Sequence, residues 1–391
     1  MNRFTAQYII TNSGPPLKRA VITTEDDGTI VSIEDTSGDL KEIHSTEFYN
    51  GIIIPGFVNC HCHLELSHLK DYSSRGKGLG DFIEQIRRTR DYKKENAHSL
   101  ISAADNYMYK EGVVLCADVS NTSDAFNIKK ESRIRYINLL EVFGLDPEKA
   151  VRQMDEIIKV AETAKALDLQ YSLVPHSAYS MSLSLLRLLR NASLNNKITS
   201  IHFMESEGEV AFLKNQTGSL MSSYIRSGLI PPRLEIPVSH ADVVLNEITK
   251  SGNLLLIHNS FADRNTIRLI KEREKLFWCL CPNSNIYIEN KIPPLKLLME
   301  EGCEIVIGTD SLASNTNLSI LDELKTLQFN FPEIPIEDLV SWATINGAKA
   351  LNEEVQYGSI EPGKKPGLLL LQNVDLQNMK LLPDSFVSRL I

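Results

Sequence analysis

The sequence lacks the features of a membrane or secreted protein. No apolar run reaches the roughly 18 residues that a membrane-spanning helix requires. The first residues contain neither a long apolar segment nor the small-residue cleavage site of a secretion signal. Cysteine is scarce, with 6 residues in 391, which is too few for the disulfide framework of a small secreted domain. We therefore expect free thiols, a cytoplasmic location and no membrane contact.

A basic surface is also missing. The net charge is -9, and no basic stripe is present that would bind a nucleic-acid backbone. The only dense basic run is Arg87-Arg88-Thr89-Arg90 followed by Lys93-Lys94, which we interpret as a solvated helix face. The expected partner is therefore a small-molecule substrate rather than a nucleic acid.

The central part of the chain alternates short apolar runs with segments of helical apolar spacing. This alternation predicts a (β/α)8 TIM barrel. A doubly wound sheet is the alternative, but the glycine-rich segment 76–80 has neither the phosphate-loop nor the dinucleotide-loop spacing. We interpret that segment as a flexible active-site loop. The predicted strands are 52–58, 113–119, 134–141, 171–175, 199–204, 254–257, 276–280 and 304–307, and clear helical spacing covers 150–166, 183–190, 266–275 and 320–329.

Both ends of the chain have a different character. Short strands separated by turn signals are predicted at 8–10, 20–22, 29–33 and 368–371. We expect a small β-sandwich domain formed from both termini, residues 1–52 plus 356–391, around a barrel domain of residues 53–355.

The most informative segment is His61-Cys62-His63 at the end of the first apolar run of the barrel. On an extended strand residues i and i+2 face the same side, so both imidazoles point to one place. Alone, the pair is either half of a metal site or two buried histidines. The same alternation places Cys60 and Cys62 on the opposite face, where we expect packing rather than metal binding, and Cys279 and Cys281 receive the same interpretation.

Chemically active residues recur at the ends of later predicted strands. Active sites of such barrels lie at the carboxyl ends of the strands. Three neutral imidazoles with one carboxylate suit zinc or ferrous iron and leave a position for water. A bound ion lowers the pKa of that water to about 7, and hydrolysis then needs a proton donor. The residues are His61, His63, His176, His202, Glu205, His258 and Asp310, and Glu205 suits the proton shuttle.

These residues carry a resemblance to a known family. The segments PGFVNCHCHLELS, PHSAYS, HFMESEGE, LIHNS, CPNSN and GTDSLASN resemble the amidohydrolase superfamily, most closely its nucleobase-deaminase and chlorohydrolase branch. The two ends of the chain resemble the small β-sandwich domain of that family. The resemblance covers nearly the whole chain.

The resemblance implies a role for each matching residue. Asp310, together with His61, His63 and His202, would bind one divalent ion, Zn²⁺ first and Fe²⁺ as the alternative. Asp310 would also accept a proton from the attacking water, Glu205 would protonate the ring nitrogen, and His258 would polarise the hydroxide or the substrate. His176 would contact the substrate, and Asn283 and Ser284 would shape a loop near the pocket. The fourth strand has no lysine to bridge two metals, which favours a single ion.

Several further positions are less clear from the sequence. Glu65 is either a second substrate contact or a loop carboxylate paired with an arginine. Pro366-Gly367 departs from the family pattern, so the closing strand is expected to sit differently. His44, His68, His98 and His240 are expected in loops or on the surface, and Trp278 and Trp342 in the core. The segment 206–252 is long enough for an extra helix and a loop over the pocket, and with 72–90 it is expected to set substrate choice.

The resulting functional hypothesis is a mononuclear metal-dependent hydrolase. It would deaminate an aminated heterocycle, such as a purine or pyrimidine base or a nucleoside-like compound. The alternatives are a cyclic amide hydrolase or a triazine-type chlorohydrolase, and more remotely a barrel that binds ligands without catalysis. The family resemblance also suggests a homodimer.

Overall fold

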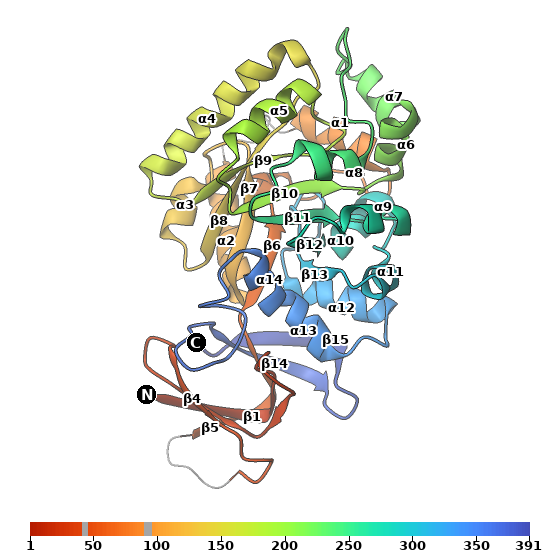
Figure 1. Cartoon of the computed structure of the whole chain (residues 1–391). Helices are drawn as coiled ribbons and strands as arrows, with labels where there is room; N and C mark the ends of the chain where they lie inside the picture. Colours follow the sequence, from red (N-terminus) through yellow and green to blue (C-terminus); the bar gives the residue numbers. More distant parts are fainter. Residues whose placement is uncertain (41–45, 90–95) are drawn as a thin grey trace.

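A computed structural model describes residues 1–40, 46–89 and 96–391 of the chain (Figure 1). The predictions for His44, Arg90, Lys93 and Lys94 fall outside these residues. Within the described part, no helix combines the length and the apolar character that crossing a membrane requires.

Both termini join in one seven-stranded sheet, on which the two ends of the chain lie (Figure 1). Strand β5 pairs parallel with β1 and antiparallel with β14. The hydrogen-bonded path is β15-β14-β5-β1-β3-β4, with β2 on β1, so a β-sandwich is not confirmed. The strands are β1 Asn2–Ile9, β2 Leu17–Lys18, β3 Val21–Thr24, β4 Ile30–Glu34, β5 Thr46–Pro55, β14 Leu368–Asp375 and β15 Lys380–Arg389.

Pro366 and Gly367 lead directly into the closing strand β14, and a different position of this strand relative to the family pattern stays a prediction. The carbonyls of both residues accept hydrogen bonds of 3.2 Å from the backbone N–H of Gly56, and β14 continues in register with β5 from Leu368 opposite Pro55. The predicted domain boundary at residue 52 lies inside β5, and the division into two domains stays a prediction.

Strand β5 serves two hydrophobic clusters because its side chains alternate between its faces. Ile53 packs with Phe4 and Leu370 in the cluster of the terminal sheet. Ile52 and Ile54 belong to the large cluster that extends into the central part of the chain. All three isoleucines are fully buried.

The central part is a TIM-barrel-like α/β arrangement of two four-stranded parallel sheets. Isolated parallel bridges, Cys62 with Asp310 and Ser177 with His202, lie where the two sheets meet. One continuous eight-stranded ladder is not formed among the described residues, so the barrel prediction holds at this coarser level. The strands are β6 Phe57–Cys62, β7 Val113–Ser120, β8 Arg135–Val142 and β9 Tyr171–Pro175, then β10 Ile198–Phe203, β11 Asn253–His258, β12 Leu276–Leu280 and β13 Glu304–Ile307.

Helices surround these strands (Figure 1). In α4, Met154, Ile157, Ala161 and Ala164 are buried on one face at helical spacing, as the sequence pattern predicts. The helices before β10 are α1 Leu79–Thr89, α2 Ala97–Lys110, α3 Phe126–Glu131, α4 Ala150–Ala166 and α5 Leu183–Ala192, with short 3-10 turns η1 Leu64–Leu69 and η3 Pro147–Lys149.

The long segment after β10 contains α6, α7, the short α8 and the π-turn η4, so it holds the extra helix that the sequence predicts. At the start of α6 the hydroxyl of Ser206 accepts a hydrogen bond from the backbone N–H of Glu209 and so caps the helix. The remaining elements are α6 Glu207–Asn215, α7 Gly218–Arg226, α8 His240–Asp242, the π-turn η4 Val243–Glu247, α9 Arg264–Ile270, α10 Pro282–Glu289, α11 Leu295–Glu300, α12 Ile320–Asn330, α13 Ile336–Ala343 and α14 Ile345–Ala350.

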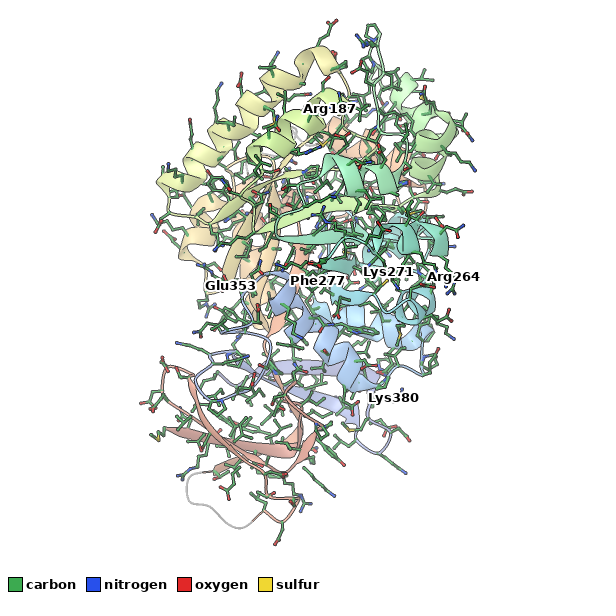
Figure 2. The ribbon with its side chains drawn as sticks, in the orientation of Figure 1. Arg187, Arg264, Lys271, Phe277, Glu353 and Lys380 are labelled. Atoms are coloured by element: carbon green, nitrogen blue, oxygen red, sulfur yellow. The ribbon has the colours of Figure 1, made fainter. Side chains whose placement is uncertain are left out.

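Polar side chains stabilise the outer ring of helices. Arg264 at the start of α9 and Lys271 just after its end are labelled in Figure 2. Both pair with Glu301, which follows α11. The helix predicted over 266–275 ends at Ile270, five residues before its predicted end. Trp278 and Trp342 are buried, as predicted.

The cysteines pack in the core, but not as simple alternation predicts. The pairing of β6 with β7 shifts register between Asn59 and Cys62. Cys60 joins one buried cluster with Cys279, whereas Cys62 joins another. The single opposite face predicted for both is wrong because this irregularity interrupts the pleat. All six cysteines are free thiols.

Candidate metal centre and active site

Residues from distant strands meet at one point of the barrel-like part. The Nε2 atoms of His61 and His63 lie 3.1 Å apart, and each lies 3.5 Å from Oδ1 of Asp310. The ring of His202 has its centroid 4.9 Å from that of His61. Three sets of potential ligand atoms each fall within 4.8 Å: His61 with His63 and Asp310, His61 with His202 and His258, and Glu141 with His176 and His202.

This spacing fits a zinc ion. Ligand atoms about 2.0–2.1 Å from a tetrahedral zinc lie about 3.4 Å from one another, close to the 3.1 Å and 3.5 Å separations found between His61, His63 and Asp310. Imidazole nitrogens with a carboxylate oxygen are also the ligand types that zinc and ferrous iron accept. The residues present therefore fit one divalent ion.

The backbone at the strand ends adopts conformations that L-residues rarely take. His258, the last residue of β11, has φ of 78°, and Asp310, three residues after β13, has φ of 57°. Left-handed backbone at a non-glycine residue costs of order 1–3 kcal/mol and concentrates at functional sites. Other non-glycine residues share this backbone conformation, among them Met204 and Asn259.

Burial keeps the imidazoles in the form that binds metal. Burial, with repulsion from neighbouring imidazoles, lowers the pKa of His63 and of His202 well below the usual value. Burial likewise lowers the pKa of His258 to about 4. Neutral imidazole offers a nitrogen lone pair, so these groups are available as ligands near neutral pH.

The carboxyl of Asp310 stays ionised in this buried place. Burial by itself raises its pKa, but the hydrogen bond with His61 and the charge of His63 outweigh burial and hold the pKa well below the usual range. Its second oxygen, Oδ2, accepts hydrogen bonds from Ser284 at 2.7 Å and Ser314 at 2.6 Å. Ser284, predicted to shape a loop, thus also holds the candidate ligand Asp310, and Ser314 adds a partner that the sequence reasoning missed.

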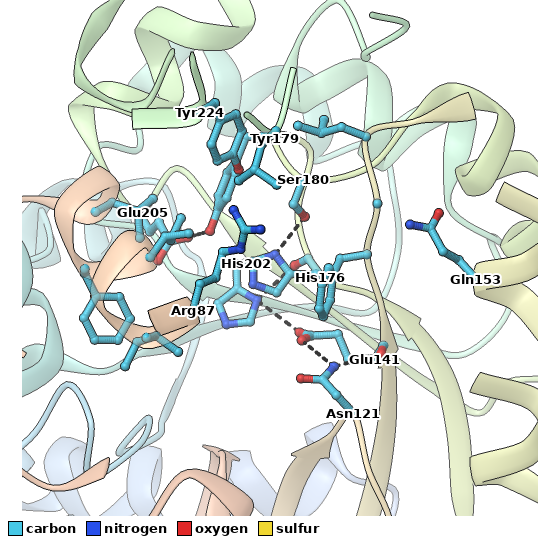
Figure 3. A pocket seen from close by; sticks show the side chains of 18 of the residues that line it. Arg87, Asn121, Glu141, Gln153, His176, Tyr179, Ser180, His202, Glu205 and Tyr224 are labelled. Atoms are coloured by element: carbon cyan, nitrogen blue, oxygen red, sulfur yellow. Dashed lines mark hydrogen bonds and ion pairs between the residues drawn. The ribbon is translucent and has the colours of Figure 1, made fainter. Parts of the chain in front are cut away.

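The orientation of the His202 ring is fixed by the partners of its Nδ1 atom. Its Nδ1 lies 2.9 Å from the carbonyl of His176 and 3.4 Å from a carboxylate oxygen of Glu141 (Figure 3). These partners leave Nε2 of His202 to face the cluster, the arrangement that commonly orients metal-binding histidines. His176 itself stacks on His202 with ring centroids 4.5 Å apart and lines the cavity.

Glu205 lies beside the cluster as a buried acid. The hydroxyl of Tyr179 donates to its Oε1 (Figure 3), and its Oε2 lies 3.5 Å from Nε2 of His258. Burial and the nearby charge of Glu209 raise the pKa of Glu205 well above the usual value. A carboxyl that holds its proton near neutral pH is what a proton donor requires.

Behind Glu205, the carboxylate of Glu209 supports the turn that carries it. Glu209 is fully buried and accepts the backbone N–H of Glu205 at 2.7 Å. Its other oxygen lies 2.7 Å from Nε2 of His240. Sequence reasoning missed Glu209, although its spacing of four residues from Glu205 was visible.

Two predictions for isolated histidines are wrong. His240 is buried against Glu209, and His68 is buried with its Nδ1 3.0 Å from the carbonyl of Glu65. Polar neighbours in the sequence suggested a surface, but helix packing encloses both rings. His98 is exposed, as predicted.

Glu65 occupies a different place from the one predicted. Its carboxylate is buried and accepts the backbone N–H of Thr122 at 3.0 Å and that of Asn121 at 3.2 Å, together with the hydroxyl of Thr122. It does not line the cavity. The structure thus places Glu65 as a support for the loop after β7 rather than as a contact for substrate.

The cluster opens into a cavity of about 520 Å³. His63, His176, His202, Glu205, His258 and Asp310 all line it. Both segments expected to set substrate choice contribute to its walls: α1 supplies Leu79, Phe82, Ile83, Ile86 and Arg87, and the region from α7 onward supplies Tyr224 and residues 228–232.

Comparison with known proteins agrees with this geometry. The amidohydrolase family pattern matches residues 52–387. An adenosine deaminase of Helicobacter pylori is 30% identical over 336 residues, 82% of this chain and 79% of the relative. A 5-methylthioadenosine/S-adenosylhomocysteine deaminase of Thermococcus onnurineus is 28% identical over 331 residues, 80% and 72% of the two chains. The crystal structure of Helicobacter pylori aminofutalosine deaminase in complex with methylthio-coformycin superposes with a TM-score of 0.78 at 25% identity, covering 95% of this chain and 92% of the other.

Proposed function

The chain belongs to the amidohydrolase family and is a hydrolase of carbon–nitrogen bonds other than peptide bonds, and from that premise we propose that it removes the exocyclic amino group of an adenine nucleoside as ammonia. The observation that carries the proposal is Glu205, a buried acid with a raised pKa beside the histidine–aspartate cluster. The names of the relatives support the substrate class, because they are deaminases of adenosine or of adenosine altered at the 5′ position.

One divalent ion would be held by His61, His63, His202 and Asp310. We favour Zn²⁺, with Fe²⁺ as the alternative. Such an ion lowers the pKa of a coordinated water to about 7. The neutral imidazoles and the ionised Asp310 described above match this assignment.

The protein residues would then move three protons. Asp310 accepts a proton from the attacking water, and Glu205 donates its proton to the ring nitrogen beside the attacked carbon. The proton on Asp310 leaves with the amino group as ammonia, and the proton of the hydroxyl added to that carbon returns to Glu205, so that a ring carbonyl remains. His258, 3.5 Å from Glu205, orients the attack, and His176 contacts the substrate.

The test is ammonia release by zinc-loaded protein from adenosine, 5′-methylthioadenosine, 5′-deoxyadenosine, guanine and cytosine. We expect turnover of the adenine nucleosides, and a loss of about 10²- to 10⁴-fold in kcat for Glu205→Gln. The zinc content of that variant, measured by mass spectrometry, should be unchanged because Glu205 is not a ligand.

Other products would contradict the proposal. Chloride release from a chlorotriazine, or ring opening of a cyclic amide, without ammonia from any purine would show that the same centre performs different chemistry. Absence of turnover together with absence of zinc binding would favour the non-catalytic barrel. The homodimer stays a prediction that sedimentation can test.

A further inference from the structure

A carboxyl group outside the cavity connects the two loops that hold the candidate ligand Asp310. Glu323 lies in the first turn of α12 and is fully buried. It is not among the described residues that line the cavity. A buried carboxyl group is costly unless hydrogen bonds replace those it makes with water. The partners of its two oxygens therefore indicate what Glu323 does.

The first of these loops leads from β12 into α10. Oε2 of Glu323 accepts the backbone N–H of Asn283 at 2.8 Å. Cys281, which precedes α10, provides no side-chain cap, so Glu323 satisfies an N–H group that the start of a helix leaves without an intrahelical partner. Thr326, one turn further along α12, donates its hydroxyl to Oδ1 of Asn283 at 2.6 Å. The next residue, Ser284, carries one of the two hydroxyls that bind the candidate ligand.

The second loop follows β13 and is held through Asn315. Oε1 of Glu323 accepts a hydrogen bond of 2.8 Å from the side-chain amide of Asn315. The same amide donates to the carbonyl of Thr309 at 2.8 Å. These two bonds fix the ends of the loop that contains Asp310 and Ser314 to each other and to α12.

The two loops meet at one oxygen of Asp310. Oδ2 accepts the hydroxyl of Ser284 from the first loop and that of Ser314 from the second. Two donors at one oxygen fix the plane of the carboxylate, with Oδ1 toward the Nε2 atoms of His61 and His63. A shift of one loop relative to the other would withdraw a hydroxyl and turn the carboxylate. Metal affinity depends on such partners of the ligands.

We propose that Glu323 is a positioning residue of the metal centre: by holding both loops with one carboxyl group, it sets the orientation in which Asp310 binds the ion and accepts a proton. This inference rests on the proposed function, in which Asp310 has both roles. It extends the centre to a residue of α12 that lies outside the cavity.

The test is the zinc affinity of Glu323→Gln, measured by competition with a chelator. Glutamine has the same shape, but its amide nitrogen accepts no hydrogen bond, so one loop loses its bond in either orientation of the amide. We expect zinc affinity to fall about 3- to 10-fold, the effect of one hydrogen bond. In zinc-saturated protein, kcat for an adenine nucleoside should fall while KM changes less than about twofold, since substrate binding is not affected.

Two other variants of α12 make the test specific. Gln328→Met removes a buried amide whose hydrogen bonds reach the backbone of Leu381 rather than either loop. It should lower the thermal midpoint, as Glu323→Gln does, but leave zinc affinity unchanged. Thr326→Val removes a hydroxyl at a half-buried position, so it should fold, and it should weaken zinc affinity by a smaller factor than Glu323→Gln.

A protein without the two serine hydroxyls shows whether Glu323 acts through them. Residues of one hydrogen-bond network have non-additive effects. In the Ser284→Ala/Ser314→Ala background, the addition of Glu323→Gln should therefore weaken zinc affinity by less than about twofold.

The outcomes separate this inference from the proposed function. Unchanged zinc affinity in Glu323→Gln, an equal loss in Gln328→Met, or the full loss in the background without the serine hydroxyls would each overturn the role of Glu323 while the deaminase assignment stands. If Glu323→Gln does not fold, unchanged affinity in Thr326→Val overturns it. Absence of ammonia from every adenine nucleoside, with zinc bound by the wild-type protein and weakened in Glu323→Gln, would overturn the proposed function and leave the positioning role supported. Absence of zinc and iron binding by the wild-type protein would overturn both.

Discussion

Replacing Glu209 by glutamine should weaken both the fold and the proton donor, because one carboxylate holds the turn on which Glu205 lies. Glu209 accepts the backbone N–H of Glu205 at 2.7 Å and that of Met204 at 3.3 Å, and it also lies 2.7 Å from Nε2 of His240. Met204 has a left-handed backbone, with φ of 48°, so the turn depends on such support.

The size of the effect on stability follows from these contacts. Glutamine has the same shape but only one acceptor oxygen, so at least one buried N–H loses its partner whichever way the amide turns. A hydrogen bond to a charged group contributes about 1.5–3 kcal/mol, and Glu209 is fully buried. We expect the free energy of unfolding to fall by about that amount.

The effect on activity has a definite sign with pH. The charge of Glu209 disfavours the ionised form of Glu205 and contributes to the raised pKa of that residue. Removing the charge lowers the pKa of Glu205, so less of the protonated donor is present at alkaline pH. The alkaline limb of the kcat profile should move to lower pH, and the loss of activity should be greater at pH 8 than at pH 6.

The assays are urea unfolding and the pH profile of ammonia release with zinc-saturated protein. Glu207→Gln is the matched control, since it removes the same charge from an exposed position of the same helix. A Glu209→Gln protein whose free energy of unfolding and pH profile both equal those of the Glu207→Gln control would refute the reasoning.

Two further predictions concern Ser314 and Glu323. Ser314→Ala removes one of the two hydroxyls that bind Asp310 and should weaken zinc affinity about 10- to 100-fold; competition with a chelator measures this, and unchanged affinity would contradict it. Burial raises the pKa of Glu323 to about 8 from 4.5. The protonated carboxyl of Glu323 therefore makes its full contribution to the free energy of unfolding below pH 4.5, and this contribution is lost as pH rises through 8. Wild-type protein should lose free energy of unfolding between pH 5 and 8 more steeply than Glu323→Gln, and parallel urea titrations with equal slopes would count against this.

The sequence was sufficient to predict which residues at strand ends lie together in one cluster. His61, His202 and His258 each occupy the carboxyl end of an apolar run, and the chain topology brings such ends together. The structure places all of them in one cluster, while their individual roles in catalysis stay proposals.

Residues that act through other residues could not be predicted in the same way. Ser314 and Glu209 have ordinary sequence surroundings, and their importance depends on which hydroxyl or backbone N–H the fold places beside them. His68 and His240 were misjudged because burial is decided by the packing of helices that sequence spacing does not position. The packing of Cys60 in the core was predicted correctly, but the face it shares with Cys62 was not, because a register irregularity breaks the alternation on which that prediction depended.

Local sequence patterns also could not predict how the strands from the two termini pair. Strand β5 lies beside β1 and β14, and β14 comes from the opposite end of the chain. Alternating apolar residues predict strands, but they do not specify whether those strands form one sheet or two that face each other.

The alternation of Ile52, Ile53 and Ile54 between two hydrophobic clusters has a consequence for how the protein unfolds. One strand belongs to both clusters and is followed after a single residue by β6, which carries His61. Loss of the terminal sheet would therefore expose apolar residues of the barrel-like part and free the strand that carries the first candidate metal ligand. We expect the two parts to melt in one cooperative transition, so that zinc bound at one end of the molecule stabilises strands contributed by both chain termini.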